Sequence, residues 1–272
     1  RAHGLGVIVV DHQARVRELP ERDQKTDILS TRLQVGGPVP TALALLRRFG
    51  VSSRFHGAWG DDSNGLLIEE DLRREGIAFD AGSRRAGHPS GYAHVWVEEA
   101  TAKRNIAAYR GPENLVVPFE WKAGLESKDA LILDGWPPAA AIDAAQGMRE
   151  RGGRVFLDLG SPKERLTELL NLVDHINCPE TLLNRLFGPI EIETGAHRLL
   201  AMGPRSVTVT SGARGAQWFQ ADGHWSHPGF SIEAVDTTGA GDVFAGAITY
   251  GSMEGWLPSH VLGFACAAAA LK

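Results

Sequence analysis

The chain combines an acid with a run of small residues where a helix is expected to begin, in the stretch AVDTTGAGDVFAGA at residues 234–247. Apolar side chains follow the acid at helical spacing, at Val243, Phe244, Ala247 and Ile248. At the start of such a helix the backbone N–H groups of Gly239, Ala240 and Gly241 have no partner within the helix, and small side chains let an anion approach them closely. These residues are therefore predicted to form an anion hole.

Asp242 falls in the first turn of the same helix. The helix dipole favours its ionised form there, so Asp242 can accept a proton from a hydroxyl group brought beside it. An anion hole next to an ionised base suits phosphoryl transfer to an alcohol, which depends mainly on positioning and charge neutralisation. The simpler alternative is an acid that only caps the helix after a glycine-rich turn. The stretch is not a Walker A loop, because no G-x-x-x-x-G-K-[ST] pattern is present.

The elements that must position these residues alternate along the chain. Strand-like apolar runs are predicted at 6–11, 130–135, 153–160, 174–178 and 206–212, and GFSIEAV at 229–235 can form a further strand before the glycine-rich turn. Helical patterns are predicted at 41–50, 64–76, 139–153 and 163–172. This alternation is typical of a mostly parallel sheet covered by helices on both faces, and so of an α/β fold.

Two segments, 13–37 and 88–110, instead alternate polar and apolar residues, as strands with one solvated face do. We expect them to pair as a small β-sheet that forms a lid over a site at the strand ends. Two unrelated surface hairpins are the alternative. The expected core then consists of residues 1–12, 38–87 and 111–272, and the lid of 13–37 and 88–110.

The bulk composition narrows the classes of function. A formal net charge of -5 argues against a general nucleic-acid binder, because no basic surplus is present to neutralise phosphates. The two cysteines, Cys178 and Cys266, have no spacing that predicts a disulfide framework or a zinc site. The longest apolar run, near GFACAAAAL, is too short to span a bilayer. We expect a cytoplasmic protein that binds neither nucleic acid nor membrane.

The D-T-T-G-A-G-D sequence at 236–242 resembles the C-terminal motif D-T-x-G-A-G-D of the ribokinase-like (PfkB) carbohydrate kinases, and the resemblance extends over nearly the whole chain. The segments GGPVPTALALLRRFG at 36–50 and GAWGDDSNG at 57–65 are similar to the first-half motif of that family. The resemblance implies a three-layer α/β/α fold with a mostly parallel central sheet and a small β-sheet lid. It also implies ATP and Mg²⁺ as cofactors.

Roles on the acceptor side follow from the resemblance residue by residue. Asp242 would be the general base, with the backbone amides of 239–241 as the anion hole. Asp11 would hold sugar hydroxyls, and Gly36 and Gly37 would let the backbone approach the sugar without a Cβ in its space. Thr41 stands where many members carry Asn, which favours a different hydroxyl pattern from that of ribose. Lys25, on the expected lid, is a candidate contact for a negatively charged substituent.

The resemblance also assigns the nucleotide side. Asn177-Cys178-Pro179-Glu180 matches the N-x-x-E element that orders magnesium and its waters, although an N-capping box explains the bare pattern equally well. TSGARG at 210–215 is similar to the family's T-x-G-x-x-G, which lies against the nucleotide through Thr210, Gly212 and Gly215. Asp236 matches a segment that binds a monovalent cation such as K⁺ in several relatives.

The leading hypothesis is an ATP-dependent sugar kinase that phosphorylates a primary hydroxyl, with a ketohexose-like acceptor favoured over ribose or a nucleoside. A nucleoside or sugar-acid kinase of the same family and a non-catalytic sugar or nucleotide sensor are the alternatives. A nicotinamide-dependent dehydrogenase is disfavoured, because the glycines of GLGVIVVD precede the strand and no third glycine opens a helix. The resemblance also implies a homodimer formed through the lid.

Overall fold

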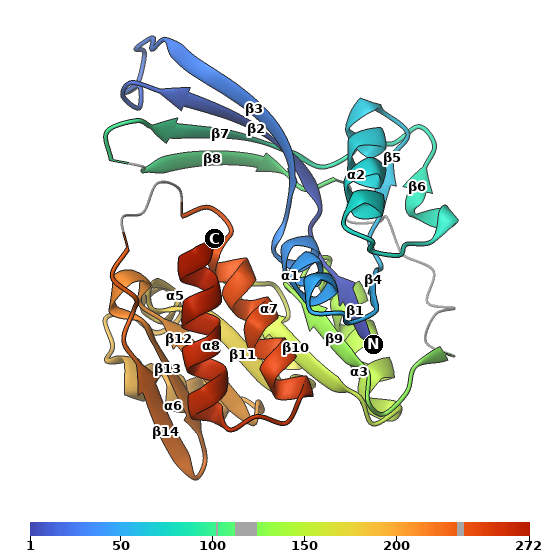
Figure 1. The fold of residues 1–272 in the computed structure, drawn as a ribbon, viewed down its shortest axis with the longest axis vertical. Helices are drawn as coiled ribbons and strands as arrows, with labels where there is room; N and C mark the ends of the chain where they lie inside the picture. Colours follow the sequence, from blue (N-terminus) through green and yellow to red (C-terminus); the bar gives the residue numbers. More distant parts are fainter. Residues whose placement is uncertain (102, 112–123, 233–236) are drawn as a thin grey trace.

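The computed structural model describes residues 1–101, 103–111, 124–232 and 237–272. An eight-stranded sheet forms the larger unit, in the order β14-β13-β12-β11-β10-β9-β1-β4 (Figure 1). The strands from β12 to β4 are all parallel, and β13 and β14 join one edge in antiparallel orientation. The bounds of the strands are β1 Ala2–Leu5, β4 Ser53–Phe55, β9 Ala130–Leu133, β10 Arg154–Asp158, β11 His175–Pro179, β12 Ser206–Thr210, β13 Ala216–Gln220 and β14 Gly223–His227.

Helices cover both faces of this sheet, which makes the predicted three layers. One face carries α1 (Pro38–Arg48), α7 (Ala240–Met253) and α8 (Pro258–Leu271). The other carries α3 (Pro138–Glu150), α4 (Leu166–Leu170), α5 (Glu180–Phe187) and α6 (Ile192–Leu200).

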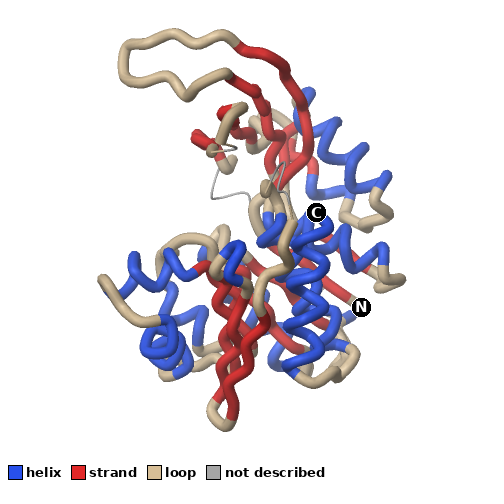
Figure 2. The backbone as a smooth tube through the Cα atoms, turned by 60° about the vertical axis from the view of Figure 1, so that its left-hand side comes forward, coloured by secondary structure: helices blue, strands red, loops and turns tan. Residues whose placement is uncertain are grey.

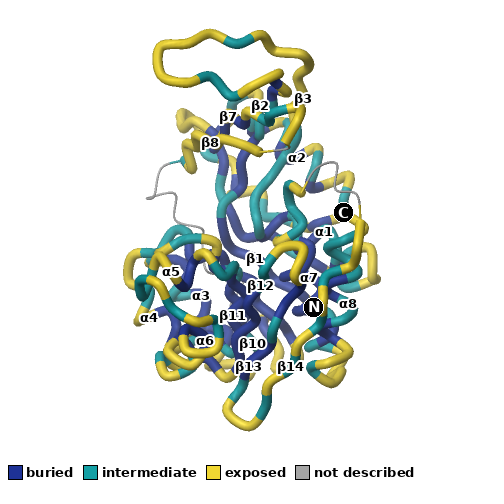
Figure 3. The backbone as a smooth tube through the Cα atoms, turned by 90° about the vertical axis from the view of Figure 1, so that its left-hand side faces the viewer, coloured by how far each residue is buried: buried dark blue, intermediate teal, exposed yellow. Residues whose placement is uncertain are grey.

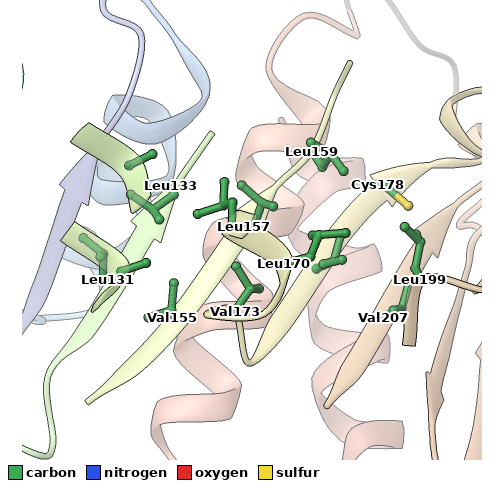
Figure 4. Packing of buried hydrophobic residues seen from close by; sticks show 14 of the residues in the cluster. Leu131, Leu133, Val155, Leu157, Leu159, Leu170, Val173, Cys178, Leu199 and Val207 are labelled. Atoms are coloured by element: carbon green, nitrogen blue, oxygen red, sulfur yellow. The ribbon is translucent and has the colours of Figure 1, made fainter. Parts of the chain in front are cut away.

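Strand β9 shows why the apolar runs predicted this arrangement. All of its residues are buried. Leu131 and Leu133 pack into the core beneath α3 and α4, together with Leu157 and Leu170 (Figure 4), whereas Ile132 points into the core on the α1 side. Because successive side chains of a strand point to opposite faces, a strand covered on both faces needs an apolar residue at every position.

A second, four-stranded sheet stands apart from the large one (Figures 1 and 2), in the order β3-β2-β7-β8. Its strands are β2 (Val9–Val16), β3 (Ile28–Gly36), β7 (Tyr92–Glu98) and β8 (Arg104–Tyr109). β2 pairs antiparallel with β3 and parallel with β7, so the expected pairing between the two distant segments is confirmed. The loop between β2 and β3 is mostly exposed (Figure 3). The remaining elements of this part are α2 (Ser63–Arg74) and the short pair β5 (Trp59–Gly60) and β6 (Arg84–Arg85).

Three predicted elements differ in the structure. The core strand expected at 6–11 is wrong, because β1 covers Ala2–Leu5 and Val9–Asp11 already belong to the small sheet. The start of β2 is itself buried, so its apolar run has the character of a core strand. The helix expected at 163–172 is reduced to α4, because Arg165 before it has a left-handed φ of 52°. Residues 229–232 form no strand.

Within the described residues, no helix has the length and apolar character needed to cross a membrane.

Candidate active site

The strand order of the large sheet reverses its direction between β1 and β9, and the carboxyl ends of these two strands lie side by side there. β1 and β9 are neighbours, but β4 lies beyond β1 on one side and β10 beyond β9 on the other. Open α/β sheets bind ligands at such switch points. Here Asp134, directly after β9, accepts hydrogen bonds from the backbone N–H of Val7 at 2.7 Å and of Trp136 at 2.9 Å. Asp134 therefore ties the two strand ends together.

Asp134 is not among the residues that the sequence analysis assigns to the site. Asp134 is 2% exposed, and burial raises the pKa of its carboxyl group. Gly6 permits this approach, because a Cβ there would lie 2.6 Å from Asp134 Oδ2. The available signal in the sequence was an acid that directly ends the buried run at 130–133.

Asp242 lies in the first turn of α7, as predicted. The helix dipole, which was expected to favour the ionised form of Asp242, is opposed by other influences on its pKa. Burial, with the carboxylate of Asp134 and that of Asp11 adding to it, raises the pKa of Asp242 to about 6, against the opposing charge of Arg104. Asp242 is still mostly ionised at neutral pH, and its pKa lies close to the pH at which a general base is most effective.

The residues of the predicted anion hole lie at the start of α7. Gly239 is the N-cap of α7 with a φ of 81°, a conformation that favours glycine. The amide of Ala240 already donates to the carbonyl oxygen of Thr237 at 3.3 Å. The described residues provide no acceptor for the amide of Gly241, and a Cβ added at Gly241 would meet no atom within 4 Å. Gly241 thus offers the open donor, and Asp236 lies outside the described residues.

Asp11 lies on the small sheet, opposite Gln34 of β3. Burial raises its pKa to about 6, while a hydrogen bond from Gln34 and the charge of Arg104 lower it. Gly36 lies directly against it, because a Cβ at Gly36 would be 2.4 Å from Asp11 Oδ2. The expected reason for this glycine therefore needs correction: the side chain of Asp11, rather than a sugar, fills the space.

Gly37 and Thr41 meet at the start of α1. Gly37 has a φ of 126°, and a Cβ there would lie 2.2 Å from the carbonyl oxygen of Val7. The hydroxyl of Thr41 donates to the carbonyl oxygen of Gly37 at 2.9 Å. Thr41 Cγ2 lies 3.9 Å from the position of a Cβ on Gly239, so α1 reaches the anion hole. The hydroxyl group of Thr41 is nevertheless already engaged by the backbone.

Lys25 does not join this group. It is exposed in the loop between β2 and β3, beyond Val16. Val16 is five residues further along β2 than Asp11, which corresponds to about 17 Å at the usual rise of a strand. The prediction that Lys25 contacts the acceptor is not supported by this position.

A cavity of about 290 Å³ opens beside the start of α7. Its lining includes Thr210, Gly212 and Gly215, together with Ala240 and Gly241 of the anion hole. The predicted nucleotide loop and the anion hole are therefore brought together. The rest of the lining is largely apolar and includes residues the sequence analysis did not assign to the site, namely Phe230, Ile232, Phe244 and Cys266.

Asn177 lies in the middle of β11 (His175–Pro179), opposite Asp158, the last residue of β10. Its amide Nδ2 donates to Asp158 Oδ1 at 2.9 Å, and its Oδ1 is buried without a hydrogen-bond partner in the described part of the chain. Burial and the carboxylate of Asp242 raise the pKa of Asp158 to about 8. Asp158 was not predicted as a site residue, although it too ends an apolar run.

Glu180 begins α5, and its carboxylate is paired with Arg214. A hydrogen bond with Ser211 and this ion pair hold the pKa of Glu180 below its usual value. Arg214 belongs to the short 3-10 turn Gly212–Arg214, so the N-x-x-E element and the predicted nucleotide loop are linked directly.

The arrangement is compatible with a group-transfer site. A carboxyl group with a pKa near 6, an open backbone amide and an adjoining cavity with apolar walls lie at the carboxyl edge of a parallel sheet. A second carboxylate, Asp11, approaches from the small sheet, and its charge reaches Asp242. Such a site can hold an anionic donor in the cavity and remove a proton from an acceptor held between the two sheets.

Comparison with known proteins gives a consistent result. Residues 5–272 match the sequence model of the family described as pfkB family carbohydrate kinase. The chain is 28% identical to the ATP-dependent ribose-1-phosphate kinase of Halopiger xanaduensis over 251 residues, which cover 90% of this chain and 82% of the relative. It is 28% identical to fructokinase-1 of Zea mays over 238 residues, which cover 78% of this chain and 72% of the relative.

Among solved structures, the ribokinase of Arabidopsis thaliana in complex with ribose and ATP has a similar fold. The TM-score is 0.81 at 25% sequence identity, and the match covers 99% of this chain and 91% of the other.

Proposed function

The chain belongs to the pfkB family of carbohydrate kinases, and from this premise we propose that it transfers the γ-phosphoryl group of ATP to a primary hydroxyl group of a small sugar. The single observation that carries the proposal is the position of Asp242, beside the open amide of Gly241 and the adjoining cavity. The relatives named above include an ATP-dependent kinase and a ribokinase solved with ATP, which supports ATP as the donor. ATP is available in the cytoplasm, and we propose that location.

In the proposed reaction, Asp242 accepts the proton of the acceptor hydroxyl as its oxygen forms a bond to the γ-phosphorus. The bond from that phosphorus to the bridging oxygen of the β-phosphate breaks, and ADP leaves with the electron pair. The open amide at the start of α7 stabilises the charge on the transferred group. The apolar walls of the cavity, among them Phe230 and Phe244, suit the base of the nucleotide.

The residues around Asn177 fit a magnesium ion bound through water. Mg²⁺ prefers oxygen ligands and retains several waters, and Asn177 Oδ1 is a buried oxygen that no described residue satisfies. Glu180, three residues after Asn177 and the first residue of α5, would hold a further water. The metal would neutralise charge on the donor phosphates. A monovalent cation at Asp236 rests on the family resemblance alone.

The acceptor is proposed to lie between Asp11 and Asp242, with the backbone at Gly36 and Gly37 beside it. An exocyclic CH₂OH extends furthest from a ring held by Asp11, so a primary hydroxyl reaches the base most easily. A ketohexose-like furanose remains the favoured acceptor, because Thr41 offers no free amide group and its hydroxyl is engaged by Gly37.

We also propose that the small sheet of β2, β3, β7 and β8, which extends the expected lid segments 13–37 and 88–110 back to Val9, is a lid, and that a second copy of the chain covers its exposed face. Leu33, Tyr92 and Tyr109 share that face by register, and they are 56%, 37% and 38% exposed. Sedimentation at working concentration should give a dimer, and Leu33→Glu should convert it to a monomer. Leu66→Glu, on the exposed side of α2, is the matched control and should leave the dimer intact. A monomeric wild-type protein would reject this part of the proposal.

The activity is tested by measuring ADP release from MgATP across pentoses, ketohexoses, sugar phosphates, sugar acids and nucleosides. We expect at least one sugar to stimulate ADP release, with phosphate recovered on its primary hydroxyl. A clear preference for adenosine would assign a nucleoside kinase instead, and the absence of stimulation by every acceptor would refute the proposed transfer.

A further inference from the structure

Lys163 lies at the carboxyl edge of the large sheet, in a segment that the sequence predicted to be helical. Because α4 begins only at Leu166, Lys163 remains in the loop after β10, and its side chain runs against Gly135, where a Cβ would lie 3.0 Å from Lys163 Cγ. It is half-buried. Burial lowers the pKa of Lys163, while the carboxyl groups of Asp134 and Asp158 act in the opposite direction.

A second cation reaches the same place from the small sheet. Arg110 directly follows β8, and its guanidinium carbon lies 5.7 Å from the centre of the Trp136 ring. Its charge also acts on both Lys163 and Asp134. A guanidinium group stacked on an indole keeps its N–H edges open to another partner. Two cations from separate sheets therefore meet at the end of β9.

Within the described residues, neither Lys163 nor Arg110 forms a direct ion pair with a carboxylate. The nearby carboxyl groups are engaged elsewhere, since Asp134 accepts two backbone N–H groups and Asp158 accepts from Asn177. Lys163 and Arg110 also repel each other, because the charge of Arg110 lowers the pKa of Lys163. An anion placed between them would relieve this repulsion and use the open donors.

The position favours the acceptor over the nucleotide. The cavity proposed for the nucleotide is lined from β12, α7 and α8, and neither cation contributes to it. Asp134, by contrast, influences Lys163 on one side and the base Asp242 on the other. A molecule presenting its hydroxyl to Asp242 would therefore direct another of its groups toward Lys163 and Arg110.

We propose that the acceptor carries an anionic substituent, a carboxylate, sulfonate or phosphate, and that the Lys163 ammonium and the Arg110 guanidinium groups bind it. This inference rests on the proposed sugar kinase activity and narrows its substrate class to anionic sugars. Lys25, the cation that the sequence singled out for such a contact, lies at the wrong end of the small sheet.

The test compares kcat/KM for fructose, fructose 6-phosphate and gluconate, each of which has a free primary hydroxyl group, at saturating MgATP. We expect one of the two anions to exceed fructose about 100-fold, which would also distinguish a phosphate from a carboxylate. Lys163→Met and Arg110→Gln should each lower kcat/KM for that anion about 10- to 100-fold, at least ten times more than for fructose. Lys163→Arg should restore most of the loss, and Lys128→Met, which removes an exposed charge before β9, should have no effect.

A preference for fructose over both anions would overturn the inference while leaving the kinase activity established. So would equal losses with fructose and the anion, or a rise confined to the KM for ATP. Calorimetric titration of fructose 6-phosphate and of gluconate into the same variants provides a readout independent of turnover. Binding that is lost in Lys163→Met would support the anion site even if no acceptor were phosphorylated, whereas no binding of either anion to the wild type would refute it.

Discussion

The pKa of Asp242 is set by opposing influences. The start of α7 favours the carboxylate, whereas burial and the negative charge of Asp134 favour the protonated form and raise its pKa to about 6. A carboxyl group titrating near neutrality is a stronger base than an exposed aspartate, yet it remains mostly ionised at pH 7. The balance of the two influences, rather than the helix end alone, suits Asp242 to accept a proton.

Replacing Asp242 by Asn keeps the shape of the side chain and removes the base. We expect kcat to fall about 100-fold or more, because general-base catalysis contributes at least that factor in most enzymes. Nucleotide binding, followed by calorimetric titration of ATP, should persist, since the cavity walls are unchanged. A variant that retained wild-type kcat on its best acceptor would exclude Asp242 as the base.

The rate should rise with pH through the pKa of Asp242 and level off above about pH 7, because only the carboxylate accepts a proton. Arg104 lowers the pKa of both Asp242 and Asp11. Arg104→Gln should therefore move the acidic limb of the kcat/KM profile to higher pH and reduce activity more at pH 6 than at pH 8. Arg22→Gln, in the exposed loop after β2, is the matched control. An identical acidic limb in Arg104→Gln and the wild type would contradict this electrostatic link.

Glu180 is paired with Arg214 in the structure, and its proposed role in holding a water of the metal can be tested separately. Glu180→Gln keeps the hydrogen-bonding shape but removes the charge. The magnesium concentration for half-maximal activity should then rise severalfold, with kcat at saturating magnesium less affected. Unchanged magnesium titration curves would remove Glu180 from the metal site and leave it as the partner of Arg214 alone.

At the scale of elements, short sequence motifs predicted correctly those features that depend on residues close together in the sequence. Glycine before an acid and an apolar helical pattern placed the start of α7 correctly, because the cap of a helix depends on its neighbours in sequence. The run at 6–11 misled because burial beside α2 and burial in the central sheet select the same apolar residues. The polar–apolar alternation that marks the rest of the small sheet is missing at the start of β2, where Val9 and Val10 are both buried.

The residues of the candidate site also fall into two groups, those that the sequence predicted and those that it did not. Asp242, Gly239 and Gly241 come from one continuous motif and were predictable, whereas Asp134, Lys163 and Arg110 meet only after three distant segments fold together. The left-handed backbone at Arg165 delays the start of the expected helix to Leu166 and leaves Lys163 in the loop, and no glycine at this position signals it in the sequence. The fourteen-residue stretch around Asp242 is local in sequence, whereas the proposed acceptor site depends on tertiary contacts.

The strands of the small sheet provide a test of the proposed lid. Hydrogen exchange should slow in β2, β3, β7 and β8 when the best acceptor and a nonhydrolysable ATP analogue bind together. The hairpin of β13 and β14, at the far edge of the large sheet, should exchange at an unchanged rate and serves as the internal control. Equal exchange with and without ligands in all four strands would argue against closure.

At the scale of the whole molecule, the chain crosses repeatedly between the two sheets. The first crossing follows β1, and the second returns from β3 through Gly36 and Gly37 to α1. A Cβ at Gly37 would collide with the carbonyl oxygen of Val7, so the segment leading from β1 to β2 lies against the segment leading from β3 to α1. Asp11 and Arg104 belong to strands of the small sheet, whereas Asp242 lies in α7 and Asp134 directly after β9, both in the unit built on the large sheet.

Because the residues of the candidate site come from both sheets, the arrangement bears on how slowly ATP is hydrolysed by water when no acceptor is bound. We expect the proposed lid to close on a molecule that contacts both Asp11 and Asp242, and a single water molecule is a poorer bridge between them than a sugar. We expect ADP release without an acceptor to be at least about 1,000-fold slower than with the best sugar. A five-carbon or six-carbon molecule that fills the gap, even without a transferable hydroxyl, should accelerate hydrolysis by closing the sheets around the donor and a trapped water.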